Sequence, residues 1–339
     1  EDLFLNFGGL IQSDTGDITF TPTVLAATDN HIVAFAAGTS VTTGGAVTFT
    51  GTSENGSVLL NGALNAGGAV SIEAGATSAN LLVAVDGQLA AGGLVTIGSA
   101  GVTATSTINI GGTLAAGGGL TVNGGAGAST IINSTGTSVI TATGAIALNG
   151  GTTGNTVINL AGTIANLSST TTISGSTAGG ITTVNMTGST SSVGNVQIDY
   201  SGAGIANVVL AGSIASGGTV TVLNLATSAG NLFATVSGSV TGTGFIVGAS
   251  SSADTINLTG TITGPSTLNG FGGDDLFYLK PQAGSFFTID GGMGAADTVQ
   301  ILTSLLNIVS ANLAAATFTV PSGFQSWSLS NVETIIPFV

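Results

Sequence analysis

The sequence predicts an all-β chain that forms a single parallel β-helix, or β-solenoid, with about 25 residues per coil. Two observations predict this fold. A glycine-punctuated segment repeats along most of the chain, and short stretches within each repeat alternate apolar with small polar residues. Helical periodicity is absent outside residues 304–316. Repeats of this kind bury their apolar faces by stacking on one another.

The repeat is clearest near the middle of the chain. The segment from Gly87 reads GQLAAGGLVTI, and it returns 25 residues later, from Gly112, as GTLAAGGGLTV. Glycines that follow one strand and precede the next recur at intervals of 22 to 26 residues. They are Gly38, Gly62, Gly87, Gly112, Gly136, Gly162, Gly188, Gly212, Gly238 and Gly260. We expect each glycine to supply a positive φ angle at a corner of the coil.

Alternating segments flank each of these glycines. Examples are Thr-Val-Thr-Val at 219–222 and Thr-Val-Ile-Asn-Leu at 156–160. Such alternation predicts strands with one buried face. Stacked about 4.8 Å apart, roughly eleven or twelve coils make a rod on the order of 55 Å long. Asparagines near strand ends are expected to form stacked amide ladders. They are Asn109, Asn159, Asn185 and Asn257.

Three regions are expected. Residues 1–37 form irregular N-terminal coils and a candidate assembly interface, and residues 38–269 form the regular solenoid. Residues 270–339 are richer in aromatic residues, which indicates further coils together with a cap or docking segment.

Composition excludes several classes of function. The 339 residues include one Lys or Arg, fifteen Asp or Glu and no Cys, and the net charge is -14. With a single cationic residue the chain cannot replace counterions on nucleic acid or adhere to an anionic membrane. No apolar run reaches the length of a membrane span. Lys280 is the only lysine and His31 the only histidine.

Segments such as GTLAAGGGLTV and Gly-Asp-Ile-Thr-Phe at 16–20 resemble the passenger repeats of filamentous-haemagglutinin-type adhesins and autotransporters of Gram-negative bacteria. The resemblance covers about residues 8–263. It implies a right-handed parallel β-helix at the bacterial surface or outside the cell.

The segment 270–336 resembles the hemolysin-type (RTX) calcium-repeat proteins. Gly-Gly-Asp-Asp-Leu-Phe at 272–277 and the stretch from Asp290 to Thr298 are similar to single, divergent copies of their nonapeptide, and Ser-Asn-Val-Glu-Thr-Ile at 330–335 is similar to the motif that often follows. The resemblance implies secretion and Ca²⁺ bound by Asp carboxylates and Gly carbonyls. The copies here do not form an uninterrupted tandem row.

The candidate calcium ligands are Asp274, Asp275, Asp290 and Asp297. Hard oxygen ligands on glycine turns suit Ca²⁺. The alternative is that these carboxylates only accept hydrogen bonds from turn backbones. Calcium is the one cofactor that the sequence suggests.

An enzyme is not expected. A β-helix lyase needs a basic residue, and a β-helix glycosidase needs paired carboxylates, which the middle coils lack. His31 lies between Asn30 and Ile32, and we interpret it as a surface or turn residue. No nucleophile motif or phosphate-binding loop stands out from the abundant glycine.

The two ends are the expected interfaces. The chain enters directly as a core strand, which has two explanations. Either the chain is cut from a longer protein, or another subunit covers the first coil by head-to-tail stacking, which generates a filament. The candidate interface residues are Glu1, Asp2, Leu3, Phe4, Leu5, Phe318, Phe324, Trp327 and Phe338.

The sequence therefore predicts a non-enzymatic structural protein, a homopolymer that forms an extracellular or cell-surface bacterial filament. One alternative is an adhesin or autotransporter stalk that presents a surface to a glycan or host receptor. Another is a calcium-binding RTX-type secreted protein. A carbohydrate-active β-helix enzyme is the most distant alternative.

Overall fold

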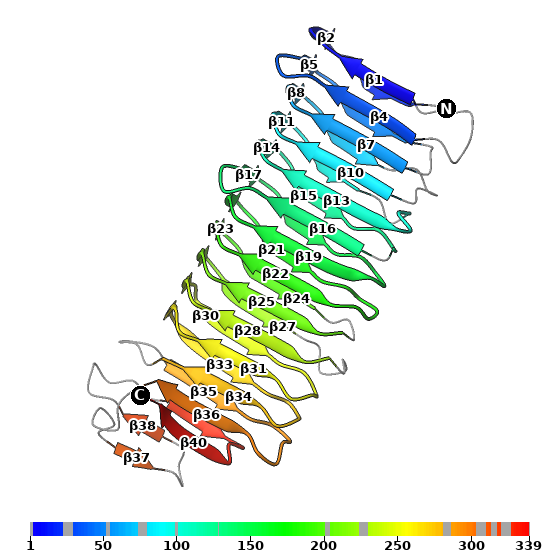
Figure 1. The fold of residues 1–339 in the computed structure, drawn as a ribbon. Helices are drawn as coiled ribbons and strands as arrows, with labels where there is room; N and C mark the ends of the chain where they lie inside the picture. Colours follow the sequence, from blue (N-terminus) through cyan, green and yellow to red (C-terminus); the bar gives the residue numbers. More distant parts are fainter. Residues whose placement is uncertain are drawn as a thin grey trace.

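The computed structural model confirms the predicted fold: it is a parallel β-solenoid of stacked coils (Figure 1). It describes residues 3–22, 30–51, 55–73, 80–98, 101–127, 129–200, 204–223, 230–280, 286–302, 310–312, 317–319 and 327–338. Within these ranges every regular element is a β-strand. Each of the first eleven coils contributes one strand to each of three sheets, which matches the predicted number of coils.

The longest strands of the regular coils form sheet 1, which has fourteen strands. In order they are β1 (Leu3–Phe7), β4 (Asn30–Phe35), β7 (Asn55–Leu60), β10 (Asn80–Val85), β13 (Thr105–Ile110), β16 (Ser129–Ser134), β19 (Asn155–Leu160), β22 (Thr182–Met186), β25 (Ala206–Leu210), β28 (Leu232–Val236), β31 (Thr255–Leu258), β34 (Leu276–Leu279), β36 (Thr298–Leu302) and β40 (Thr334–Phe338).

Sheet 2 has eleven strands and holds the segments that follow the repeat glycines. They are β2 (Leu10–Ser13), β5 (Ser40–Thr43), β8 (Ala63–Ala66), β11 (Gln88–Ala91), β14 (Thr113–Ala116), β17 (Val139–Ala142), β20 (Thr163–Asn166), β23 (Ser189–Ser192), β26 (Ser213–Ser216), β29 (Ser239–Thr241) and β32 (Thr261–Thr263).

Sheet 3 has fifteen strands. They are β3 (Ile18–Phe20), β6 (Val47–Thr50), β9 (Val70–Glu73), β12 (Val95–Ile97), β15 (Leu120–Asn123), β18 (Ile146–Asn149), β21 (Thr171–Ser174), β24 (Val196–Asp199), β27 (Thr219–Leu223), β30 (Gly244–Gly248), β33 (Pro265–Asn269), β35 (Phe286–Asp290), β39 (Trp327–Ser330), β38 (Thr317–Thr319) and β37 (Ser310–Asn312). The last two strands pair antiparallel, whereas the rest of the sheet is parallel.

The core runs along the axis of the solenoid. In β13 the side chains of Ser106, Ile108 and Ile110 face inward and are buried, while the residues between them are partly exposed. The same alternation recurs in each regular coil, because strand side chains point to opposite faces in turn. Val, Ile and Leu dominate the buried set, so one continuous apolar core links successive coils.

Stacked asparagines on the outer face of sheet 1 confirm part of the predicted amide ladder. The amide Nδ2 of Asn133 donates to Oδ1 of Asn109 at 2.9 Å, and Asn159 and Asn185 continue the ladder at 2.9 and 2.8 Å. Asn257 does not join it, because Val209 and Thr235 occupy that column in the coils between.

The repeat glycines are required by close stacking, which corrects the predicted role in positive φ angles. Of the ten, only Gly38 has a positive φ. A Cβ added to Gly188 would lie 2.0 Å from the carbonyl oxygen of Gly162, and one added to Gly212 would lie 1.9 Å from that of Gly188. At these glycines the carbonyl oxygen of the preceding coil occupies the space that a side chain would need.

Two glycines do not belong to this column. Neither Gly38 nor Gly136 would have an atom within 4 Å of an added Cβ. The stacking position is held instead by Thr39 and Ser138, whose backbone carbonyls face the glycines of the next coils, Gly62 and Gly162. In these two coils the glycine belongs to a turn just before the stacked position.

His31 is buried, so its interpretation as a surface or turn residue was wrong. Its side chain is 3% exposed, and it lies in β4 with an inward-facing ring. The ring fills space that two glycines leave open: a Cβ on Gly51 or Gly56 would lie 2.3 or 2.8 Å from Cε1 of His31. Burial lowers the pKa of His31.

Replacing Gly188 with Ala should destabilise the solenoid by about 3 kcal/mol, because the new Cβ meets a backbone oxygen that cannot move aside alone. Gly136→Ala is the matched control, since its Cβ enters open space; it should change stability by less than about 1 kcal/mol. Urea unfolding followed by circular dichroism measures both. Equal stability of the two variants would contradict the stacking argument.

Candidate functional site

Four acidic residues occupy one position in successive C-terminal coils. Asp254, Asp275, Asp297 and Glu333 each stand immediately before a strand of sheet 1, namely β31, β34, β36 and β40. We call these four residues the carboxylate column. The equivalent position in the middle coils carries a small hydroxyl side chain. Those residues are Ser106, Thr130, Thr156 and Thr182.

Each carboxylate accepts a hydrogen bond from the backbone of the preceding coil. The N–H of Asp254 donates to Oδ1 of Asp275 at 2.8 Å, and that of Asp275 donates to Oδ1 of Asp297 at 2.7 Å. At the ends of the column, Leu232 N–H donates to Asp254 and Asp297 N–H donates to Glu333. The column is therefore a chain of backbone-to-carboxylate bonds along the solenoid axis.

These bonds replace ordinary sheet bonds. In the middle coils the same N–H donates to a backbone carbonyl: Thr182 N–H to Ile205 at 2.8 Å, and Ala206 N–H to Asn231 at 2.9 Å.

The carboxylates begin where the coil shortens. Paired residues of sheet 1 are 24 to 26 residues apart between β10 and β19, but 21 or 22 apart between β28 and β36.

The second oxygen atoms of the column differ between coils. Oδ2 of Asp254 accepts bonds from the N–H of Ser250 at 2.6 Å and from its hydroxyl at 2.9 Å. In the next two coils the equivalent N–H groups, of Phe271 and Gly292, donate to Asn269 and Asp290 instead. Oδ2 of Asp275 and of Asp297 is consequently buried without a hydrogen-bond partner among the described residues.

Burial is the main cause that raises the pKa of Asp275 to about 8. The hydrogen bond from Asp254 N–H opposes this shift, and the charges of Asp254, Asp297 and Asp274 add to it. Burial also raises the pKa of Asp254 and of Asp297. A buried carboxyl without a cation beside it favours its neutral form, so burial favours the protonated forms of Asp254, Asp275 and Asp297 in the folded chain.

The four predicted calcium ligands divide into two pairs. Asp275 and Asp297 point inward in the column, whereas Asp274 is exposed and its Oδ1 accepts the N–H groups of Ala295 and Ala296 at 2.9 and 3.1 Å. Oδ1 of Asp290 accepts Gly292 N–H and the amide of Asn331. Asp274 and Asp290 therefore hold turns. In the described part of the chain, no three His, Cys, Asp or Glu side chains converge on one point.

Sequence reasoning missed Asp254 and Glu333 as members of the column. A signal was present: Ala-Asp-Thr followed by an apolar residue occurs at both 253–256 and 296–299, and Glu333 precedes Thr334 in the same way.

The structure allows a partial fit to calcium. A Cβ on Gly270 would meet both Oδ2 of Asp275 and the carbonyl oxygen of Gly291, so these two oxygens lie beside the same glycine. Oδ2 of Asp297 and the carbonyl oxygen of Asn331 lie in the same way beside Gly291. Carboxylate and carbonyl oxygens are the ligand types that Ca²⁺ prefers. The types of ligand therefore fit Ca²⁺. Their number is small, because only one carboxylate oxygen and one carbonyl oxygen lie beside each of these two glycines.

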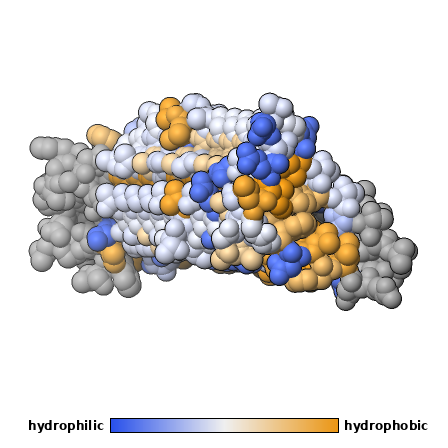
Figure 2. All heavy atoms as spheres, turned by 90° about the horizontal axis from the view of Figure 1, so that it is seen from above, coloured by the Kyte–Doolittle hydropathy of each residue, from blue (hydrophilic) through white to orange (hydrophobic). Residues whose placement is uncertain are grey.

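The N-terminal end of the solenoid presents an apolar face. Leu5, Phe7, Ile11, Ile18 and Phe20 are only partly buried and pack on the end of the core; we call them the end face. Strands β1, β2 and β3 stand at the ends of their sheets, so each pairs on one side only within the described chain. Figure 2 looks down on this end and shows hydrophobic residues among hydrophilic ones.

Stacked rings extend from the core to the end face. Phe7 stacks on Phe35 with ring centres 5.1 Å apart, and Phe20 stacks on Phe49 at 4.8 Å. Of the predicted N-terminal interface residues, Leu3 and Leu5 are partly buried, while Phe4 points outward and is 60% exposed. Glu1 and Asp2 lie outside the described residues.

The C-terminal end tapers. Among the described residues of this end, sheet 2 has its last strand at β32, sheet 3 has the antiparallel strands β38 and β37 at its edge, and sheet 1 continues to β40, which contains Pro337. Trp327 is buried against the ring of Phe287, with ring centres 5.2 Å apart, so it packs within this chain. Phe318 and Phe338 lie in β38 and β40, and Phe324 lies outside the described residues.

Comparison of the chain with protein-family models, with curated proteins and with solved structures gives no match. Among the described residues no helix has the length and apolar character needed to cross a membrane.

The stability of the C-terminal coils should fall as the pH rises in metal-free buffer. Between the ordinary pKa of 3.8 and the folded value of about 8, the folded chain keeps a proton on Asp275 that the unfolded chain has lost. The free energy of unfolding is then highest at low pH, decreases across this range and levels off above it. The fluorescence of Trp327, the only tryptophan, reports unfolding of these coils.

Asp275→Asn should remove most of this pH dependence, because an amide keeps the bond from Asp254 N–H and does not titrate. Asp274→Asn is the control, since it changes an exposed carboxylate next in sequence. Wild-type stability that rises with pH over the same range would show that Asp275 is ionised in the fold.

Proposed function

We propose that the protein is a non-enzymatic structural protein: a subunit of an extracellular bacterial filament or surface fibre that assembles by head-to-tail stacking of solenoids. The observation that carries this proposal is the regular stacking of the coils together with an apolar end face, whose strands β1, β2 and β3 pair on one side only within the described residues. A further coil placed on that face would receive hydrogen bonds from three strands at once.

The end face favours a partner built like the solenoid itself. Its three edge strands, one from each sheet, offer backbone donors and acceptors, and strand addition satisfies such groups. Its side chains are aliphatic and aromatic, so a docked coil would also bury apolar surface. A contact between two different ends of the same molecule does not close on itself and generates a filament.

A structural role also agrees with the distribution of charge. No charged residue or histidine occurs between Asp86 and Asp199, which spans more than four coils. The two side chains with a basic nitrogen, Lys280 and His31, lie at opposite ends of the solenoid, and the His31 ring is buried. Proton abstraction on the middle coils would lack a basic side chain.

The taper of the C-terminal end favours a second candidate, an adhesin-type stalk. Antiparallel strands at the edge of sheet 3 and Pro337 in the last strand of sheet 1 are features that oppose further parallel pairing. A rod closed at this end would act alone, and its side faces would carry the binding function.

The buried oxygens without partners favour a calcium-binding role as a further candidate. Oδ2 of Asp275 and of Asp297 would each gain a ligand interaction with Ca²⁺, and the carbonyl oxygens of Gly291 and Asn331 would add to it. The ion would stabilise the C-terminal coils by neutralising their carboxylates, and it would have to displace their protons.

Purified protein should form regular filaments in negative-stain electron microscopy. Phe7→Glu should abolish them, because it places a charge in the end face. Leu10→Glu is the control: Leu10 belongs to the same coil but is 66% exposed and points outward, so filaments should persist. Trp327 fluorescence checks that the distant coils of each variant remain folded. Isolated rods of wild-type protein would contradict the filament and support the stalk.

If the column binds calcium, CaCl₂ should raise the urea midpoint reported by Trp327, and EDTA should reverse the change. The effect should be larger at pH 8 than at pH 6, since protons compete with the ion. MgCl₂ at equal concentration and Asp297→Asn serve as controls, and both should show a smaller shift. An unchanged midpoint in CaCl₂ would rule out the calcium role.

A further inference from the structure

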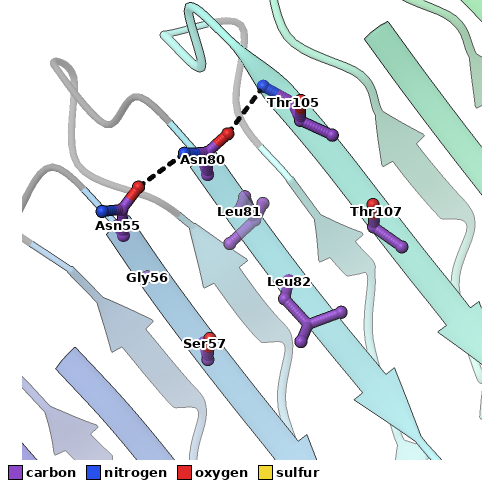
Figure 3. Close-up of a pocket in the computed structure, with 8 residues that line it drawn as sticks. All are labelled: Asn55, Gly56, Ser57, Asn80, Leu81, Leu82, Thr105 and Thr107. Atoms are coloured by element: carbon purple, nitrogen blue, oxygen red, sulfur yellow. Dashed lines mark hydrogen bonds between the residues drawn. The ribbon is translucent and has the colours of Figure 1, made fainter. Parts of the chain in front are cut away.

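A shallow groove of about 530 Å³ lies on the outer face of sheet 1, across β7, β10 and β13 (Figure 3). Six outward or edge side chains line it, and none of them carries a charge. They are Asn55, Ser57, Asn80, Leu82, Thr105 and Thr107. The groove lies far along the chain from the carboxylate column of the C-terminal coils.

Three of these residues form a row in register. Ser57, Leu82 and Thr107 are direct neighbours on adjacent strands, so a hydroxyl, an isobutyl group and a second hydroxyl follow one another. With strands about 4.8 Å apart, the two hydroxyls are separated by roughly 10 Å. Leu82 is 36% exposed between them and offers an apolar platform.

The polar groups of the groove have hydrogen-bonding capacity to spare. Asn80 donates to Oδ1 of Asn55 at 2.6 Å and accepts from Thr105 N–H at 3.1 Å, as the dashed lines in Figure 3 show. An amide nitrogen carries two hydrogens, and only one of those on Asn80 donates to a residue that the structure describes. The hydroxyls of Ser57 and Thr107 have no hydrogen bond to any residue in the described ranges.

We propose that this groove binds a neutral saccharide. A sugar ring has an apolar face of C–H groups and an edge of hydroxyls that both donate and accept. Leu82 matches the apolar face, while Ser57, Thr107 and the second amide hydrogen of Asn80 match the hydroxyl edge. Ligand sites typically combine apolar contact with a few placed polar groups. The absence of charge in the lining and the net charge of -14 disfavour an acidic sugar.

A second row of stacked amides, formed by Asn30, Asn55 and Asn80, holds this site in place. Asn55 donates to Oδ1 of Asn30 at 2.7 Å and accepts from Asn80, so the amides are fixed by bonds on both sides. A preformed arrangement costs little ordering on binding. The site does not depend on assembly of the solenoid, because single rods and filaments would present the same face.

Saturation-transfer NMR tests the proposal with glucose, galactose, mannose and N-acetylglucosamine at millimolar concentration, and with N-acetylneuraminic acid as the acidic comparison. At least one neutral sugar should give a saturation signal, and the acidic sugar should give none. Leu82→Ala and the double variant Ser57→Ala/Thr107→Ala should lose the signal.

The matched control is Thr183→Ala, which removes a hydroxyl from the same outward column three coils beyond Thr107 and should keep the signal. Circular dichroism establishes that each variant is folded. The proposal is overturned if all four neutral sugars fail with wild-type protein, or if the signal survives in both groove variants. An equal signal from N-acetylneuraminic acid would also overturn it.

Discussion

Every feature of this solenoid depends on the close approach of one coil to the next. Along the glycine column the carbonyl oxygen of one coil lies where a Cβ of the next would stand, as between Gly162 and Gly188. That contact sets the spacing at which three parallel ladders form together. It also fixes the register, so like residues meet like residues, and Asn109, Asn133 and Asn159 can share amide hydrogen bonds.

The period of the sequence was sufficient to predict the fold, because stacking requires similar residues at regular intervals. It was not sufficient to explain the glycines. A positive φ and a close backbone contact select the same residue, and only coordinates distinguish Gly38, which has a positive φ, from Gly188, which meets a carbonyl. The burial of His31 was also hidden in the sequence, because the space for its ring comes from Gly51 and Gly56, twenty or more residues away.

The candidate site shows the same limit in another form. The acidic residues near the C-terminus were visible in sequence, but their roles depend on the direction of each side chain. Asp274 and Asp275 are adjacent, and alternation along the chain places one in a turn at the surface and the other in the buried column. The column also includes Asp254, which belongs to the first of the shortened coils. In that coil a carboxylate accepts the hydrogen bond that a backbone carbonyl accepts in the middle coils. Amino-acid composition does not reveal this exchange of acceptors.

In the proposed filament, the stacking of coil on coil continues from one molecule to the next. X-ray diffraction from oriented fibres of the purified protein tests this claim most directly. Stacking along the fibre axis predicts a strong meridional reflection at about 4.8 Å, the distance between neighbouring strands. The same reflection on the equator, or protein that yields no oriented fibres, would contradict it.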